Sequence, residues 1–245
     1  MNAESRIQNP EKNCPGRFIE DGFEILTDFY SPDGCGVLAN DLSLLHEEQK
    51  KTSKNKLGGL RNLLRILPEV NELAHSSKVK GTLKRRLNKD IFPVRALFFD
   101  KTPDANWRVA WHQDLTIAVS ERIETPDFEA WSVKEEIHHV QPPREILEGM
   151  ITLRLHLDHC DISNGALKVI PRSHSNGKLD SVRIQECTAK EKIAVCEVPK
   201  GGALLMRPLL LHSSSSSKSP SHRRVLHLEY ASDELPNGLK WFERQ

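Results

Sequence analysis

The spacing of apolar residues changes once along the chain, close to residue 91. Between residues 31 and 88 they recur every three or four positions, as at Cys35, Leu38, Leu42 and Leu45. This is the spacing of one buried face of an α-helix. Ser31 and Pro32 form a typical helix start, because serine caps the first turn and proline fits its first position. We therefore predict a mainly helical part over about residues 22–91, with a further helix beginning near Pro68.

From Phe92 onward the chain consists of short runs rich in β-forming residues. The runs cover residues 93–100, 107–119, 150–158, 166–171, 193–198, 203–213 and 225–231. Turn signals such as Asn176-Gly177 separate them. Many short strands, with helices confined to one end of the sequence, indicate an antiparallel sandwich or barrel buttressed by helices. A single domain over residues 1–245 is expected, with a mainly β core over about residues 92–231.

Two of these runs carry polar side chains at alternate positions. The first places three of them on one face, namely Arg154, His156 and Asp158. The second does the same with Arg223, His227 and Glu229. Because side chains alternate across a strand, the opposite faces are apolar. If the apolar faces pack on the helices, the polar faces line a cavity.

Charge and cysteine content narrow the class of protein. Lys and Arg number 35 against 34 Asp and Glu, so the formal net charge is only +1. This balance creates no field toward nucleic acid, and no apolar run is long enough to span a bilayer, so neither partner is expected. The five cysteines are scattered, at positions 14, 35, 160, 187 and 196. They argue against a disulfide framework and indicate a reducing, cytoplasmic setting.

Two basic runs lie in the helical part, at Lys50–Lys56 and Lys84–Arg86. Charge runs of this kind are typical of a solvated helix face or loop. We interpret both runs in this way, with an anion-binding role as the alternative.

The tripeptide His112-Gln113-Asp114 has the composition of a metal site. On a strand, positions i and i+2 share a face, so His112 and Asp114 can chelate one ion. A third ligand must come from another strand, and His212 closes an expected strand over residues 209–212. Two neutral imidazoles and one carboxylate are the ligand set of non-haem Fe(II) oxygenases, in which open positions remain for a co-substrate and O2. The alternative is a His–Asp hydrogen bond within the core.

Arg223 favours the oxygenase interpretation. It follows His212 on the next strand and faces the expected cavity. A guanidinium group at such a position attracts a carboxylate. A dicarboxylic acid such as 2-oxoglutarate can then reach both the metal and Arg223.

Four segments together resemble the phytanoyl-CoA dioxygenases, a family of Fe(II)- and 2-oxoglutarate-dependent oxygenases. They are Val94–Lys101, Trp111–Asp114, Asn164–His174, and His212–Ser214 with Arg223. The resemblance covers roughly residues 92–231 and implies a double-stranded β-helix, or jelly roll. It implies an enzyme that consumes O2 and 2-oxoglutarate, releases succinate and CO2, and hydroxylates an unactivated C–H bond of a small organic molecule.

The resemblance also implies residue roles. His112, Asp114 and His212 match the iron ligands, and Arg223 matches the partner of the distal carboxylate of 2-oxoglutarate. Ser214 matches a hydroxyl near the same carboxylate. Arg154 stands where other members place an aromatic co-substrate contact, so it binds either 2-oxoglutarate or an acidic group of the prime substrate.

Other positions depart from the family or carry no clear signal. Arg172 replaces a glycine that the family usually has in the turn before His174, and His174 is expected to order that turn through hydrogen bonds. His138 and His139 fall in an expected polar loop over residues 131–143. Tryptophans such as Trp107 are interpreted as packing residues. Neither the prime substrate nor the oligomeric state can be read from the sequence.

Three other functions stay open. A cupin-like metal barrel without oxygenase activity would need no equivalent of Arg223. A family member could bind ligand without turnover, although the complete ligand set argues against this. A nucleic-acid-modifying dioxygenase could use the Lys84–Arg86 region, but the neutral net charge weakens that alternative.

Overall fold

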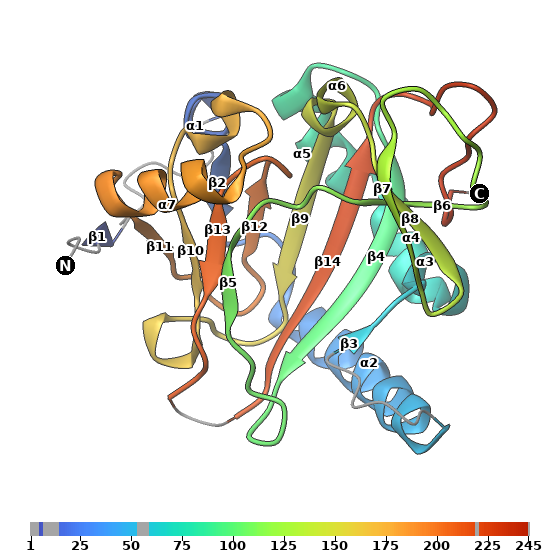
Figure 1. Ribbon diagram of the computed structural model, residues 1–245. Helices are drawn as coiled ribbons and strands as arrows, with labels where there is room; N and C mark the ends of the chain where they lie inside the picture. The colour runs from blue at the N-terminus through green and yellow to red at the C-terminus, as the bar shows by residue number, and fades with distance from the viewer. Residues whose placement is uncertain (1–4, 7–14, 53–58, 219–220, 245) are drawn as a thin grey trace.

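The computed structural model describes residues 5–6, 15–52, 59–218 and 221–244 (Figure 1). The helices are α1 Pro15–Asp21, α2 Pro32–Thr52, α3 Leu63–Ile66, α4 Pro68–His75, α5 Ser77–Leu87, α6 Arg144–Glu148 and α7 Ser181–Lys190. Two 3-10 turns are η1 Ile162–Asn164 and η2 Ser173–Asn176. The early strands are β1 Ser5–Arg6, β2 Phe23–Leu26, β3 Gly59–Leu60, β4 Phe92–Lys101, β5 Val109–His112, β6 Ile117–Val119 and β7 Glu129–Lys134. The later strands are β8 Ile137–Gln141, β9 Met150–His156, β10 Leu167–Val169, β11 Ala194–Cys196, β12 Ala203–Met206, β13 His212–Ser214 and β14 Arg223–Ala231.

Within the described residues, the strands form three sheets. The largest has the order β2-β12-β9-β14-β4-β3, and the second has the order β1-β11-β10-β13-β5. A small sheet, β6-β8-β7, lies beside them. Neighbouring strands are antiparallel apart from the short β1–β11 pair. The predicted mainly β architecture is therefore confirmed, whereas the single-domain boundary at residues 1–245 stays a prediction.

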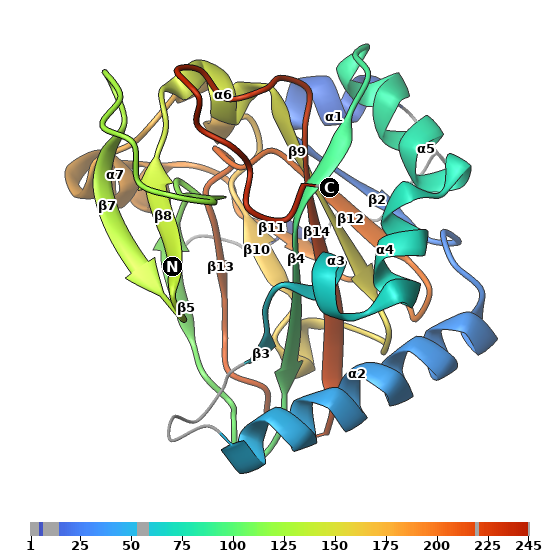
Figure 2. The same ribbon diagram turned by 90° about the vertical axis from the view of Figure 1, so that its right-hand side faces the viewer.

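Helices α2 to α5 cover the outer face of the large sheet, as Figure 2 shows. The apolar residues predicted for this face lie there, buried against the helices: Ile151, Leu153, Leu155, Leu226, Leu228 and Tyr230. The apolar face of α2 packs against these residues through Cys35, Leu38 and Leu42. Tyr230 also donates a hydrogen bond from its hydroxyl to the Ala74 carbonyl, 3.0 Å away. The predicted alternation of apolar and polar faces on β9 and β14 is thus confirmed.

The start of α2 is the predicted one. Pro32 is its first residue, and the Ser31 hydroxyl accepts a hydrogen bond from the Gly34 backbone N–H at 3.1 Å. The basic segment Lys50–Lys56 begins inside the last turn of α2, and its residues from Ser53 onward lie outside the described part of the chain. The predicted helix start near Pro68 is also confirmed by α4.

The N-terminal part contains more than helices. The run Phe23–Leu26 was not predicted as a strand, yet it forms β2 and extends the large sheet by pairing with β12. Four residues are too few to show a period, so pairing with β12 and burial decide their conformation. Helices also occur later in the chain, at α6 and α7, which corrects the expectation that they are confined to one end.

Two long predicted runs are each broken into two strands. The run 107–119 divides into β5 and β6, and the run 203–213 divides into β12 and β13. In the second case a turn intervenes, in which the Leu210 N–H bonds to the Arg207 carbonyl at 3.0 Å, and Pro208 supplies no N–H for a ladder. His212 therefore begins β13 rather than ending a strand, which corrects the prediction.

The expected polar loop over residues 131–143 is instead a β-hairpin formed by β7 and β8. Its turn residues, Glu135 and Glu136, have φ values of 51° and 65°. Such left-handed turns usually contain Asn or Gly, so two glutamates provide no turn signal. His139 is consequently a buried strand residue, and its Nδ1 donates to the Ile137 carbonyl at 3.0 Å.

Two further observations bear on the setting of the protein. Across the described residues, none of the helices combines the length and apolar character that crossing a bilayer requires. Four cysteines are free, namely Cys35, Cys160, Cys187 and Cys196, whereas Cys14 lies outside the described residues.

Candidate functional site

The predicted ligand residues His112, Asp114 and His212 come together between the two large sheets. His112, at the end of β5, pairs directly with His212, at the start of β13. Their ring centroids are 4.2 Å apart, and one ligand atom from each of the three residues lies within 4.8 Å of the others. Asp114 lies beyond the end of β5, where its N–H bonds to the Pro208 carbonyl at 2.9 Å. This backbone bond, rather than strand alternation, places its carboxylate beside the imidazoles.

Both imidazoles are oriented by backbone carbonyls. His112 Nδ1 lies 2.8 Å from the Ala110 carbonyl, and His212 Nδ1 lies 2.8 Å from the Leu210 carbonyl. Because a carbonyl only accepts, each Nδ1 carries the proton and each Nε2 keeps its lone pair. The two Nε2 atoms each lie 3.7 Å from a different oxygen of Asp114. The three lone-pair donors thus converge.

The charge states also suit a cation. Burial alone would raise the pKa of the Asp114 carboxyl, but His212, His227 and His112 outweigh it and lower the pKa to about 2. Burial lowers the pKa of His212 to about 4, against the opposing effect of Asp114. At neutral pH the site therefore presents an ionised carboxylate and a neutral His212 imidazole.

Gln113 points away from the candidate metal ligands. Its Nε2 donates to the Gly177 carbonyl at 2.8 Å and to the Leu209 carbonyl at 2.6 Å. Its Oε1 accepts from the Leu179 N–H at 2.8 Å. Gln113 therefore ties the segment that carries His112 and Asp114 to two neighbouring loops.

A cavity of about 230 Å³ opens from these residues along the inner face of the large sheet. Its wall contains the predicted metal and co-substrate residues together with others: Arg95, Leu97, Phe99, Lys101, Trp107, Val109, His112, Asp114, Arg154, Leu167, His212, Ser214, Arg223, His227 and Glu229. Trp107 thus lines the cavity, which corrects its interpretation as a packing residue.

The co-substrate residues predicted from the sequence lie together in the wall. Arg223 is buried and donates from Nη1 to the Gly165 carbonyl at 2.9 Å. Ser214 is buried nearby, and its hydroxyl accepts from Lys101 Nζ at 3.1 Å. Lys101 was not predicted as a site residue. Strand alternation would have identified it, because Lys101 shares the inner face of β4 with Phe99 and lies opposite Arg223 of β14.

A polar chain continues along the inner face from Arg154. Arg154 Nη1 donates to His227 Nδ1 at 2.8 Å, and His227 Nε2 donates to the Glu229 carboxylate at 3.0 Å. Glu229 also forms an ion pair with Arg95. Arg95 was not predicted as a site residue. The chain fixes the orientation of the Arg154 guanidinium within the cavity.

Two residues predicted to face the cavity do not line it. Burial, together with the nearby Arg154 and Arg223, holds the pKa of His156 well below its usual value, and His156 is not part of the cavity wall. Asp158 lies past the end of β9 and forms a bidentate ion pair with Arg224, both contacts at 2.8 Å. The strand ends at His156, so alternation no longer determines where Asp158 points.

The turn around residues 172–174 contains arginine at the position where the family resemblance led us to expect glycine. Arg172 adopts φ 68°, a left-handed conformation that favours glycine. The turn is held by Ser173, whose hydroxyl donates to the Ile170 carbonyl at 2.7 Å and accepts from the Leu211 N–H at 2.8 Å. Ser173 rather than the His174 ring therefore provides these cross-links to the loop before His212.

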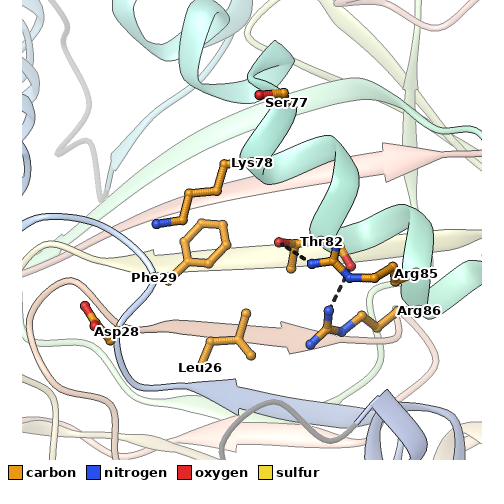
Figure 3. Close-up of a pocket in the computed structure, with 8 residues that line it drawn as sticks. All are labelled: Leu26, Asp28, Phe29, Ser77, Lys78, Thr82, Arg85 and Arg86. Carbon is orange, nitrogen blue, oxygen red and sulfur yellow. Dashed lines mark hydrogen bonds between the residues drawn. The ribbon is translucent and has the colours of Figure 1, made fainter.

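The basic segment Lys84–Arg86 lies near the end of α5, and its residues Arg85 and Arg86 line a separate pocket of about 340 Å³ (Figure 3). Lys84 is exposed and pairs with Asp90, as expected for a solvated face. Arg86 is instead buried and forms a bidentate ion pair with Glu24 of β2, at 2.7 and 2.9 Å. Its third nitrogen donates to the Thr82 carbonyl at 3.1 Å. Arg86 thus connects α5 to the sheet, which corrects the solvated interpretation for this residue.

The residues present fit an iron ion and a dicarboxylate. Two imidazole nitrogens and one carboxylate are the donor set of non-haem Fe(II) sites. Asp114 Oδ2 is buried without a hydrogen-bond partner, as are the Nε atoms of Arg95, Arg154 and Arg223. Buried polar atoms of this kind indicate a missing ligand, because leaving them unpaired is costly.

Solved structures with the same fold are numerous. EctD from S. alaskensis, solved with 2-oxoglutarate and 5-hydroxyectoine, is 16% identical with a TM-score of 0.69, covering 95% of this chain and 87% of that one. The carbocyclase SnoK from nogalamycin biosynthesis is 12% identical with a TM-score of 0.70, covering 95% and 88%. AviO1 from Streptomyces viridochromogenes Tue57 is 19% identical with a TM-score of 0.66, covering 91% and 95%. At these identities the likeness concerns the fold, and it confirms the predicted double-stranded β-helix.

Sequence comparison supplies the family. No curated protein matches the chain significantly. The family model described as phytanoyl-CoA dioxygenase (PhyH), however, matches residues 18–225, which include His112, Asp114, His212 and Arg223. The chain therefore belongs to the phytanoyl-CoA dioxygenase family, whose members are Fe(II)- and 2-oxoglutarate-dependent oxygenases.

Proposed function

We propose that this protein is a hydroxylase that uses Fe(II), 2-oxoglutarate and O2 to hydroxylate an unactivated C–H bond of a small organic molecule. The observation that carries the proposal is the single cavity that joins two kinds of group. The convergent His112, Asp114 and His212 side chains lie at one place in its wall, and the buried Arg223 lies at another.

In this proposal His112, Asp114 and His212 bind the iron. Their ligand atoms need no rearrangement of protonation, because both Nδ1 protons are held by backbone carbonyls and the Asp114 carboxyl is ionised. A metal held by three residues on one side keeps positions open for other ligands. The Gln113 hydrogen bonds would keep this segment in place while those ligands exchange.

Arg223 and Ser214 would bind the distal carboxylate of 2-oxoglutarate. Lys101 would assist them, because its ammonium group donates to the Ser214 hydroxyl oxygen and leaves the hydroxyl proton free to donate to a carboxylate. The Gly165 carbonyl fixes one nitrogen of the Arg223 guanidinium, so the remaining nitrogens are already oriented for an anion.

When bound, iron and 2-oxoglutarate supply the oxidising chemistry: O2 is consumed, 2-oxoglutarate yields succinate and CO2, and the substrate C–H bond is hydroxylated. Asp114 favours hydroxylation over halogenation, because its carboxylate fills the metal position that related halogenases leave open for chloride. The similar structures include an enzyme described as a carbocyclase and another described as an epimerase, so the hydroxylation outcome is the part that an assay must establish.

The setting is part of the same proposal. A small-molecule substrate fits a cavity of about 230 Å³ better than a macromolecule does. The four free cysteines are consistent with a reducing compartment such as the cytoplasm. The cupin-like alternative predicts metal binding without 2-oxoglutarate turnover, and the non-catalytic alternative predicts ligand binding without succinate.

The decisive experiment measures Mn(II) binding by calorimetry and 2-oxoglutarate-dependent succinate release with Fe(II) under O2. We expect His112→Ala and Asp114→Ala to lose both properties. His159→Ala is the matched control, because His159-Cys160-Asp161 repeats the His-x-Asp pattern at an exposed position and should leave both unchanged. Full retention of metal binding and succinate release in His112→Ala and Asp114→Ala would contradict the proposed site.

A further inference from the structure

The cavity wall holds more positive charge than its own carboxylates neutralise and more than Arg223 alone would supply to one end of a dicarboxylate. Four cationic side chains line it, Arg95, Lys101, Arg154 and Arg223, against two carboxylates. Glu229 is already paired with Arg95, and Asp114 lies among the metal ligands. Among the described residues, the other three cations form no ion pair with a carboxylate. Buried charges without partners are costly, so their presence indicates an anionic ligand.

Arg154 is one of these three cations of the cavity wall that pair with no carboxylate among the described residues. Sheet register places it. Arg154 on β9 is directly opposite His227 on β14, to which it is hydrogen bonded. Its guanidinium carbon lies 5.7 Å from the centre of the Phe99 ring, and Phe99 pairs with Val225, two residues from His227 toward Arg223. The guanidinium group therefore lies in the part of the cavity between His227 and Arg223.

The same group is close to both ends of the proposed ligand site. Burial and Arg223 lower the pKa of Arg154 to about 10, whereas Asp114 acts in the opposite direction. Arg154, Arg223 and the three proposed metal ligands all line the same cavity of about 230 Å³. A molecule that joins the metal ligands to Arg223 can therefore contact Arg154.

Arg154 lies on the side of the cavity where it would contact the co-substrate rather than the prime substrate. The cavity wall is more exposed on the β5 side, where the His112 side chain is 39% exposed and the Asp114 side chain 25% exposed. Arg154 is buried on the opposite sheet, at 8% exposure. An incoming substrate meets the β5 side first, whereas a ligand already seated against the large sheet contacts Arg154.

We infer that Arg154 is a second carboxylate clamp, which with Lys101 and Arg223 makes the cavity a cradle for dicarboxylates of four or five carbons even without a metal. The naming of 2-oxoglutarate and its product succinate as the ligands rests on the proposed function. The prediction that the metal-free protein binds dicarboxylates does not depend on that function. Arg154 contacts the ligand through Nε and its free Nη atom, because Nη1 is held by His227.

The test uses the full chain, stripped of metal with EDTA, and calorimetric titration with 2-oxoglutarate, succinate, glutarate and butyrate. We expect the three dicarboxylates to bind, and butyrate, which has one carboxylate, to bind at least about 10-fold more weakly. Arg154→Gln should weaken dicarboxylate binding by about 10- to 100-fold, as expected for loss of a charge-assisted hydrogen bond. Arg154→Lys should be intermediate, and the exposed Arg183→Gln should match the wild-type protein.

Three outcomes would overturn the inference. The first is that the metal-free wild-type protein binds no dicarboxylate. The second is that it binds butyrate as tightly as glutarate. Both outcomes are measured on the wild-type protein, so neither requires a folded variant. The third is Arg154→Gln with unchanged affinity, metal-free and loaded with Mn(II), which would assign Arg154 to the prime substrate. Metal-free dicarboxylate binding without succinate release contradicts only the proposed function. Succinate release without metal-free binding contradicts only this inference.

Discussion

Lys101 and Arg223 lie directly opposite each other on β4 and β14, and both side chains are buried. Like charges facing each other across a strand pair destabilise a sheet. Here the Lys101 ammonium is held by the Ser214 hydroxyl at 3.1 Å and the Ser215 carbonyl at 2.6 Å, and Arg223 by the Gly165 carbonyl. The pair therefore concentrates positive charge in the cavity wall, and in the proposed function a bound carboxylate would relieve this repulsion.

Affinity for 2-oxoglutarate should fall as the pH rises through about 8. Burial, with Arg223 and Arg154 nearby, lowers the pKa of Lys101 to about 8, and only Cys160 acts in the opposite direction. Lys101 is charged below this pH and attracts a carboxylate, and it loses that charge above it. Calorimetry between pH 7 and 9.5 should show a decline of about 10-fold in the wild-type protein. Lys101→Met should bind weakly throughout with a flatter profile, and an equally steep decline in that variant would refute the assignment.

Arg223→Gln should mainly raise the 2-oxoglutarate concentration needed for half-maximal succinate release, by about 100-fold or more. The expected cause is loss of a charge-assisted, two-pronged contact with the distal carboxylate. The neighbouring Arg224→Gln is the control, because Arg224 points to the other face and pairs with Asp158. An unchanged requirement in Arg223→Gln, or an equal change in both variants, would move the carboxylate site elsewhere.

Gly165→Ala should weaken 2-oxoglutarate binding and lower stability by about 1–3 kcal/mol. Gly165 has φ 86°, and an added Cβ would lie 2.5 Å from the Ser215 carbonyl oxygen. Relief of that clash must move the Gly165 carbonyl that orients Arg223. Gly36→Ala, in α2 with nothing within 4 Å of the new Cβ, should be neutral or slightly stabilising. Urea unfolding and calorimetry of both variants check this prediction.

Removing one partner of the buried Glu24–Arg86 pair should cost about 3–5 kcal/mol of unfolding free energy. Both side chains are only 3% exposed, so the remaining charge would be buried without compensation. The double variant Glu24→Leu with Arg86→Met should lose much less than the sum of the single variants. Additive losses in a urea-unfolding cycle would show that the two residues do not act as a pair.

Strand alternation accounts for most of what the sequence predicted correctly. It placed Arg154, His227 and Glu229 on an inner face, and the same rule applied to β4 would have added Arg95 and Lys101. The rule fails where a strand stops. Asp158 lies past the end of β9, and its direction follows from the ion pair with Arg224 rather than from the strand period.

The break points themselves could not be predicted from the sequence. His112 and Asp114 were expected on one continuous strand, yet β5 ends at His112, and the Asp114 N–H bonds to Pro208. The hairpin of β7 and β8 turns through two glutamates in a left-handed conformation, for which local sequence carries no preference. Both features depend on contacts with segments distant in the sequence.

The sequence by itself determined the kind of chemistry and predicted the residues that carry it. The ligand types of His112, Asp114 and His212 are intrinsic to their side chains, and the apolar periodicity fixes which faces can be buried. Tertiary structure alone decided that three cations meet in one cavity. Lys101, Arg154 and Arg223 come from β4, β9 and β14, and only the pairing of these strands brings their charges together. A cradle for an anion is a property of distances between charges, which a sequence does not contain.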